Sequence, residues 1–323
     1  MKYQYWLANI SGVGTRAIHK MLAQTESAEE IYHLDQNGLA KISGISDRQR
    51  AAIAEKKKSW DLEKEYESLL SQGIHFLSYE MDAYPDTLRN ISDPPYSLYV
   101  KGCMPDFTKR RAAIVGARMC SDYGKAFARK IGYSFGRQGV EVISGLARGI
   151  DSYGHEGALE GNGRTFAVLG CGVNCCYPQS AEKLYDRILK QGGILSEYPP
   201  DTKPLPCLFP ARNRIISALS DMVIVVEAKE KSGSLITADF ALEQGKDVYA
   251  GPGRITDALS TGCNNLIRQG AGIITSVEEL QKDLGFEQPE EFVQENFNKL
   301  LLEKDESLVY ACLSLRPKSM EEL

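Results

Sequence analysis

Residues 112–151 read AAIVGARMCSDYGKAFARKIGYSFGRQGVEVISGLARGID, and this stretch decides the fold. A short apolar segment, Ala112–Val115, precedes a helical pattern over Lys125–Arg137, and a second apolar segment follows at Val140–Ser144. A loop that contains glycine follows each apolar segment. Short apolar strands that alternate with helices are typical of a parallel, doubly wound sheet. The stretch therefore predicts the start of a Rossmann-like α/β core.

The same alternation continues toward residue 275. Further strands are expected at Thr165–Leu169, Ile194–Ser196, Met222–Glu227, Asp247–Ala250 and Gly272–Thr275. Further helices are expected at Ile150–Leu159, Ala181–Lys190 and Leu235–Gln244. Before this core, residues 74–101 contain several prolines that interrupt any period, so we expect extended segments and turns there.

The two ends of the chain differ from this core. The first 70 residues have a helical pattern, and Ile10–Gly14 and Ile42–Ile45 resemble the turns of tandem helix-hairpin-helix units. A small helical bundle that only packs is the alternative. Near the C-terminus, an acidic stretch precedes a second helical pattern. We therefore predict four parts: a helical domain at 1–72, a Rossmann-like core at 73–276, an acidic linker at 277–297, and a final segment at 298–323.

Composition limits the class of protein. The chain has 323 residues, of which 43% are apolar, and eight cysteines without the spacing of a disulfide framework. Neither a secretory signal nor an apolar run long enough for a membrane span is present, so we expect a cytoplasmic protein. The net charge is −5, but residues 98–276 hold 22 Lys and Arg against 17 Asp and Glu. This basic middle permits a local anion-binding surface, although simple scatter of surface charge is the alternative.

The loops that follow the strands carry unusual residues. In an open parallel sheet, ligands bind at the carboxyl ends of the strands, near helix N-termini. Glycine lets the backbone approach a ligand, serine and backbone N–H groups donate to phosphate oxygens, and arginine adds a bidentate fork. The residues that we expect to form a phosphate-binding rim are Gly116, Arg118, Ser144, Gly145, Arg148, Lys231, Ser232, Gly233 and Ser234.

Three more basic residues precede or begin an apolar helix. Arg212 and Arg214 flank Asn213 at the start of this helix, and we expect them to reach the same rim. A structural clamp on the sheet edge is the alternative for both arginines. Lys203 lies in a proline-rich loop before them, where an exposed lysine would contact a phosphate backbone.

Other chemistries fit the sequence less well. The first strand is not followed by G-x-G-x-x-G, and the second strand ends in Ser144-Gly145, not in an acidic residue, which argues against a dinucleotide oxidoreductase. A Walker A loop is absent as well. Cys171, Cys175 and Cys176 lack a second pair at zinc-ligand spacing. We expect structural roles for His155 and Asp151, no catalytic residue, no metal and no cofactor.

A set of motifs then identifies a family resemblance. The motifs are Ser144–Asp151, Ala167–Gly170, Tyr177-Pro178, Ser196-Glu197, Phe209–Ile216, Glu227-Ala228, Ser232–Leu235, Thr237-Ala238 and Gly251–Gly253. Over about residues 85–275, the chain resembles the DprA/Smf family of DNA-processing proteins. The resemblance implies an extended Rossmann-like core, an N-terminal sterile-alpha-motif-like domain, and a C-terminal segment that is the start of a truncated winged helix.

The resemblance also implies a function. It implies sequence-independent binding of single-stranded DNA, homodimers, loading of RecA onto incoming strands, and a part in natural transformation and recombination. In the family, a Gly-Ser-Arg loop holds the DNA backbone; here the loop is Gly116-Ala117-Arg118, so the hydrogen bond of the serine is missing. A phosphoribohydrolase-like or other nucleotide-binding enzyme on the same core is one alternative. A nucleotide-sensing or scaffold protein that needs no DNA is another.

Overall fold

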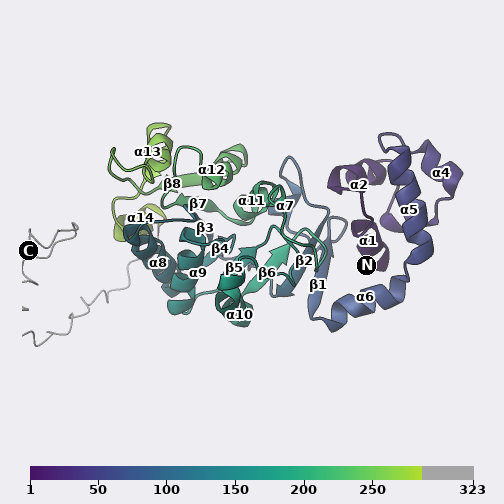
Figure 1. The fold of residues 1–323 in the computed structure, drawn as a ribbon, viewed down its shortest axis with the longest axis horizontal. Coiled ribbons are helices and arrows are strands. Elements are labelled where there is room, and N and C mark those ends of the chain that lie inside the picture. Colours follow the sequence, from purple (N-terminus) through teal and green to yellow (C-terminus); the bar gives the residue numbers. More distant parts are fainter. Residues whose placement is uncertain (286–323) are drawn as a thin grey trace, which may run out of the picture. The chain divides into compact units, whose positions relative to one another are not determined.

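In a computed structural model that describes residues 1–285, these residues build one mainly parallel nine-stranded sheet with helices on both faces (Figure 1). The strand order is β1-β2-β6-β5-β4-β3-β7-β8-β9. The strands are β1 (Ile74–Ser78), β2 (Ser97–Gly102), β3 (Arg111–Val115), β4 (Glu141–Ser144), β5 (Thr165–Val168), β6 (Gly193–Ser196), β7 (Met222–Val225), β8 (Asp247–Ala250) and β9 (Gly272–Ile273). This confirms the doubly wound α/β fold. The proline-rich connector supplies β1 and β2, which pair antiparallel with each other, and β2 also pairs antiparallel with β6.

The central strands are short, and each is buried on both faces. Every residue of β3, β4, β5, β6 and β7 is buried. Such strands need helices on both sides to cover their apolar side chains. One face packs against α8 (Asp122–Arg137), α9 (Ile150–Glu160) and α10 (Glu182–Gln191). The other face packs against α7 (Asp86–Arg89), α11 (Leu208–Leu219), α12 (Gly233–Glu243) and α13 (Thr261–Arg268).

The connection through α11 creates a switch point in the sheet. From β3 the chain adds β4, β5 and β6 in one direction, and α11 then carries it back to β7 on the other side of β3. Loops at the carboxyl ends of β3 and β7 therefore leave the sheet toward opposite faces and open a crevice between them. Ligands of open α/β sheets bind in such crevices.

The helical N-terminal region contains two hairpins. Its helices are α1 (Lys2–Ala8), α2 (Thr15–Leu22), α3 (Ala28–His33), α4 (Gln36–Lys41), α5 (Asp47–Ser59) and α6 (Leu62–Ser71). Gly12 and Gly44 adopt positive φ angles of 82° and 79° in the α1–α2 and α4–α5 turns. Where the first turn has Gly14 without a side-chain cap, the second has Ser46, which forms a capping box with Gln49. The less regular second hairpin is therefore held by side-chain hydrogen bonds.

The acidic stretch begins with a helix instead of a linker. α14 covers Val277–Asp283. Val277, Leu280 and Leu284 are apolar residues at helical spacing. The acidic residues around them make this helical pattern hard to recognise in the sequence. A boundary between two units lies at Val277/Glu278. The rest of the expected linker and the expected winged-helix segment, 298–323, lie outside the described residues, so these domain limits stay a prediction. Within residues 1–285, no helix is long and apolar enough to cross a membrane.

Candidate functional site

Two adjoining cavities lie at the carboxyl ends of β3, β4, β5 and β7. The smaller has a volume of about 400 Å³ and the larger about 840 Å³. Both are lined by Arg118, Met119, Ala147, Phe209 and Arg212. Because they share these residues, we treat the two as one feature and name it the rim groove. It occupies the switch point of the sheet, where the loops with glycine and arginine were expected to meet.

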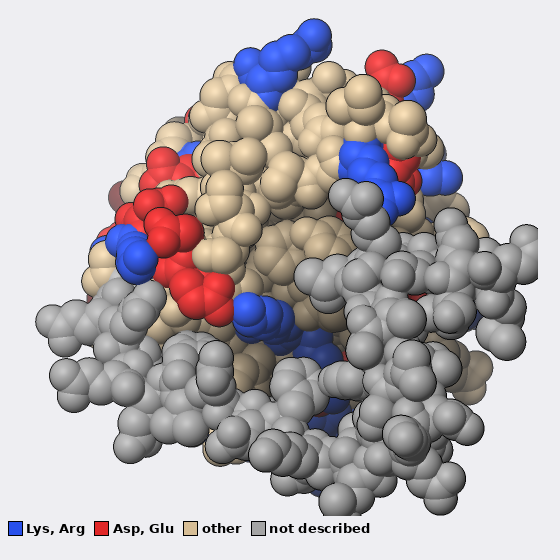
Figure 2. Space-filling view, turned by 90° about the vertical axis from the view of Figure 1, so that its left-hand side faces the viewer, with Lys and Arg blue, Asp and Glu red and all other residues tan. Residues whose placement is uncertain are grey.

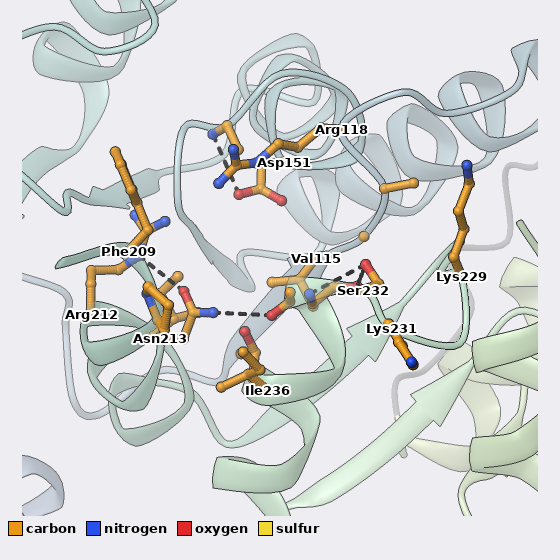
Figure 3. A pocket seen from close by; sticks show the side chains of 18 of the residues that line it. Val115, Arg118, Asp151, Phe209, Arg212, Asn213, Lys229, Lys231, Ser232 and Ile236 are labelled. Atoms are coloured by element: carbon orange, nitrogen blue, oxygen red, sulfur yellow. Dashed lines mark hydrogen bonds between the residues drawn. The ribbon is translucent and has the colours of Figure 1, made fainter. Parts of the chain in front are cut away.

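Four exposed cations border the rim groove. Arg118 follows β3, Arg148 follows β4, and Lys229 and Lys231 follow β7. Figure 3 shows Phe209 and Asn213 on one side of the smaller cavity, with Lys229 and Lys231 on the opposite side. Within residues 1–285, none of the four forms an ion pair, so their charges are available to an anionic ligand.

The basic character is local. Figure 2 shows one face on which basic and acidic side chains form small separate groups among uncharged residues. No continuous basic surface is visible on the described part of that face, and the net charge of the whole sequence is −5. The four cations of the rim groove therefore matter through their position at one cavity, not through the charge of the whole chain.

The N-terminus of α12 opens into the smaller cavity. Ser232 caps this helix, its hydroxyl oxygen accepting the N–H of Ser234 at 3.4 Å, and Gly233 is exposed between them. The amide of Asn213 donates to the Gly233 carbonyl at 3.2 Å and so ties α11 to this helix end. The backbone N–H of Gly233 and the dipole of the helix favour an anion at this position.

The N-terminus of α8 is closed by contrast. The carboxylate of Glu227 accepts the backbone N–H of Ser121 at 2.9 Å and also bonds the Ser121 hydroxyl. Gly124 in the first turn leaves room for this carboxylate, since a Cβ there would collide with it. Dinucleotide-binding folds place a pyrophosphate at the helix that follows the first strand. Here an internal carboxylate fills that place, which agrees with the missing glycine motif.

Arg212 lines both cavities but is almost completely buried, with 4% exposure. Its Nη1 donates to the Gly145 carbonyl at 2.9 Å and to the Val168 carbonyl. Burial lowers the pKa of Arg212 to about 10, although the nearby Asp151 charge opposes this. The guanidinium thus holds two strand ends together, as the clamp alternative for this residue predicts.

Arg214 does not reach the rim groove. It forms a bidentate ion pair with Glu197, at 2.8 and 2.6 Å, and its Nε donates to the Asp93 carbonyl at 2.8 Å. Burial lowers the pKa of Arg214, but the hydrogen bonds and charge of Glu197 outweigh burial and leave it raised. Two residues along a helix turn the side chain by about 200°, so Arg212 and Arg214 point in opposite directions. Arg214 instead lines a separate cavity beside the first hairpin.

Of the remaining predicted residues, some line the rim groove and others do not. Gly116, Gly145, Ser232, Gly233 and Ser234 line the rim groove. Ser144 is completely buried, and its hydroxyl donates to the Ile114 carbonyl at 2.6 Å. Lys203 is exposed but lines neither cavity.

Sequence reasoning missed several lining residues. Lys229 was overlooked although it precedes Lys231 in the same loop, and its place in the loop after β7 was an available signal. Tyr177 lies in a loop and Phe209 in the first turn of α11, and their ring centroids lie 5.3 Å apart at 34°. The Arg118 guanidinium lies 5.7 Å from the Phe209 ring centroid. These rings give the rim groove flat apolar surfaces next to its cations.

His155 lies outside both cavities. It is completely buried, with Nδ1 at 2.6 Å from the Thr165 hydroxyl. Burial, and secondarily the charge of Arg212, lowers the pKa of His155 to about 3, so the ring is neutral at physiological pH. Among residues 1–285, no group of three His, Cys, Asp or Glu side chains is arranged to hold a metal ion.

The sequence model of the family described as DNA recombination-mediator protein A matches residues 75–285, which include the whole rim groove. The chain belongs to this family. DNA processing protein DprA from Streptococcus pneumoniae is 38% identical over 291 residues, covering 88% of this chain and 98% of the relative. An X-ray structure of that DprA superposes with a TM-score of 0.76 at 37% identity and covers 90% of this chain and 99% of the other.

A second structure of the family concerns single-stranded DNA. It describes the single-stranded DNA binding mode of DNA processing protein A from Helicobacter pylori. It superposes with a TM-score of 0.59 at 31% identity and covers 65% of this chain and 95% of the other. The resemblance to the DprA/Smf family that the motifs indicated is thereby confirmed.

Proposed function

We propose that this member of the recombination-mediator protein A family binds single-stranded DNA in the rim groove, mainly through its phosphates and without strong sequence preference. The observation that carries the proposal is the convergence of four exposed, unpaired cations and an open helix N-terminus on one crevice. The single-stranded DNA named for the Helicobacter pylori relative supports the same ligand.

Each part of the rim groove has a chemical role in this proposal. Arg118 and Arg148 neutralise phosphates, and Lys229 and Lys231 extend the basic edge. The backbone N–H of Gly233 donates to a phosphate oxygen at the start of α12. Gly116 and Gly145 line the groove, and their missing Cβ atoms make room for Ile150 and Arg212 within the protein. The rings of Tyr177 and Phe209 offer faces on which bases of any sequence can stack.

The buried members of the predicted set take a different role. Arg212 and Ser144 bond the backbone within the sheet edge, and Arg214 bonds Glu197 away from the groove. We therefore assign direct DNA contact to the exposed residues and keep Lys203 as a contact outside the two cavities.

The cellular role follows the family. We propose that the chain acts in the cytoplasm as a homodimer, protects incoming single strands and loads RecA onto them during transformation and recombination. The family description, a recombination mediator, supports this role. We propose a binding protein and not an enzyme. Asp151 at the groove accepts backbone N–H groups of the protein itself, and His155 is neutral and lies outside both cavities.

Fluorescence anisotropy tests the proposal with labelled oligo-dT and a matched duplex at two salt concentrations. We expect a salt-sensitive preference for the single strand that Arg118→Ala reduces by about tenfold for every base sequence. Arg187→Ala is the control, because Arg187 is exposed on α10 and lines neither cavity. Absence of binding at low salt would overturn the proposal. Nucleotide binding or release of free base from a nucleotide would then favour the enzyme alternative.

A further inference from the structure

Two buried side chains of opposite charge form hydrogen bonds with the backbone of one loop of the rim groove. The Oδ2 atom of Asp151 accepts the backbone N–H of Gly145 at 3.1 Å and that of Ala147 at 3.4 Å. The Nη1 atom of Arg212 donates to the Gly145 carbonyl at 2.9 Å. Asp151 is 6% and Arg212 4% exposed. Both backbone polar groups of Gly145 are therefore fixed from beneath the loop by charged groups.

The loop needs such fixing because its backbone is strained. Leu146 has a φ of 54°, in the left-handed region that side chains other than glycine rarely adopt, and Gly149 has a φ of 80°. The space at Gly145 is also limited, because a Cβ there would lie 2.5 Å from the Arg212 guanidinium. A backbone held in a sparsely populated conformation persists only when its surroundings determine it.

The same loop packs directly on the backbone that carries Arg118. The N–H of Ile150 donates to the Ala117 carbonyl at 3.2 Å. At Gly149 the two loops approach so closely that a Cβ would lie 2.7 Å from the Arg118 carbonyl oxygen. A shift of the loop would therefore move Arg148, which the loop itself carries, and Arg118 together.

We propose that Asp151 and Arg212 are positioning residues that hold the Gly145–Gly149 loop so that Arg118 and Arg148 face one strand of DNA. This assignment rests on the proposed function. It predicts an effect of Asp151 on DNA affinity that is opposite to the effect expected from charge repulsion alone. Asp151 is an acidic residue at the wall of an anion-binding cavity, yet its presence strengthens DNA binding.

The two explanations predict opposite effects of removing the carboxylate. If Asp151 acts only through its charge, an uncharged replacement relieves repulsion and tightens DNA binding. If it acts through the loop, the replacement releases two backbone N–H groups and leaves the buried Arg212 without the opposite charge of Asp151, so DNA binding weakens. Burial raises the pKa of Asp151 and the Arg212 charge lowers it, which agrees with a carboxylate that depends on its partner.

The test measures oligo-dT affinity of Asp151→Asn and Asp151→Ala in the full chain. We expect Asp151→Ala to weaken binding by about tenfold and Asp151→Asn by about threefold, because the asparagine oxygen still accepts the two N–H groups. Asp186→Asn is the matched control; Asp186 is exposed on α10 and lines neither cavity. Unchanged or tighter binding by both Asp151 variants would overturn the proposal.

A second set of variants covers loss of folding, which circular dichroism and thermal unfolding monitor. Ser152→Ala removes a hydroxyl that donates to the Ala147 carbonyl at 2.7 Å and leaves no buried charge. We expect it to weaken DNA binding by about twofold. In a double-mutant cycle with Arg148→Ala, the effects of Asp151→Asn and Arg148→Ala should fall short of additive. Full additivity in this cycle, or unaltered binding by Ser152→Ala, contradicts the positioning role.

The same measurements separate this inference from the proposed function. If the parent chain does not bind oligo-dT at low salt, the proposed function itself is wrong. If the parent binds and Arg148→Ala weakens it, while the Asp151 and Ser152 variants bind as the parent does, only the positioning role is wrong.

Discussion

Four arginines near one edge of the sheet occupy two opposite environments. Arg118 and Arg148 lie on loops directly after strands, are exposed, and line the rim groove. Arg212 and Arg214 lie on α11, are buried, and bond carbonyl or carboxylate oxygens of the protein itself. The comparison shows that an arginine in a motif predicts a hydrogen-bond acceptor, but not whether that acceptor belongs to a ligand or to the protein itself.

The two environments predict different consequences when the charge is removed. An exposed, unpaired arginine contributes little to the stability of the fold, so its loss lowers only the affinity for the ligand. A buried arginine leaves its partners without a countercharge or a donor when it is replaced, which destabilises the fold. Replacing Arg118 or Arg148 should therefore lower DNA affinity with little change in stability. Replacing Arg212 or Arg214 should lower stability.

Arg214→Ala should have the largest effect. It leaves the Glu197 carboxylate, with 8% side-chain exposure, without its bidentate partner. We expect the free energy of unfolding to fall by about 3–5 kcal/mol in urea denaturation. Arg118→Ala should change it by no more than about 0.5 kcal/mol. Equal losses in the two variants would contradict the division into structural and ligand-binding arginines.

The double variant Arg118→Ala/Arg148→Ala is next. We expect oligo-dT affinity to fall on the order of tenfold to a hundredfold, because two charge-assisted contacts are lost. The slope of log affinity against log salt should become shallower by about 1.4, since each neutralised phosphate of a single strand contributes about 0.7. Titrations at several salt concentrations with two unrelated base sequences measure both quantities. A loss confined to one base sequence would argue against contacts to the backbone.

Local pattern predicted the sheet, its loops and the edge at which they meet. Those features depend on residues that are neighbours in sequence, such as Ala112–Val115 and the loop after it. Burial of Arg214 depends on the rotation of α11 relative to Glu197, which lies on a distant segment. The pairing of Tyr177 with Phe209 likewise needs a loop and a helix start that only the fold brings together. Sequence reasoning therefore named residues that line the groove together with two arginines that the structure buries, and their contact with a ligand stays a prediction.

Acidic pH should lower the stability of the fold through the buried His155, and it should leave the charges of the exposed arginines unchanged. The native pKa of His155 is lowered to about 3, against about 6.5 for an unfolded chain, so protons bind the unfolded state first as pH falls. Its contribution to stability is therefore lost below about pH 6.5, by about 2 kcal/mol between pH 7 and pH 5. Urea denaturation of the parent and of His155→Gln at both values isolates this group. Equal pH dependence of the two proteins would show that His155 titrates normally.

The smallest expected effect is that of replacing two lysines. It tests how far the bound single-stranded DNA extends beyond the rim groove. Lys229 lines the smaller cavity, whereas Lys203 is exposed in a loop that borders neither cavity. With an oligonucleotide of about 8 nucleotides, Lys229→Ala should weaken binding by about threefold, and Lys203→Ala should leave it within about 1.5-fold of the parent. Anisotropy titrations with oligonucleotides of increasing length complete the comparison. An effect of Lys203→Ala that appears only with longer strands would place this lysine on the path beyond the rim groove. An effect already present with the short strand, equal to that of Lys229→Ala, would instead mean that the strand lies across the proline-rich loop from the start, and that the cavity boundaries do not delimit the binding surface.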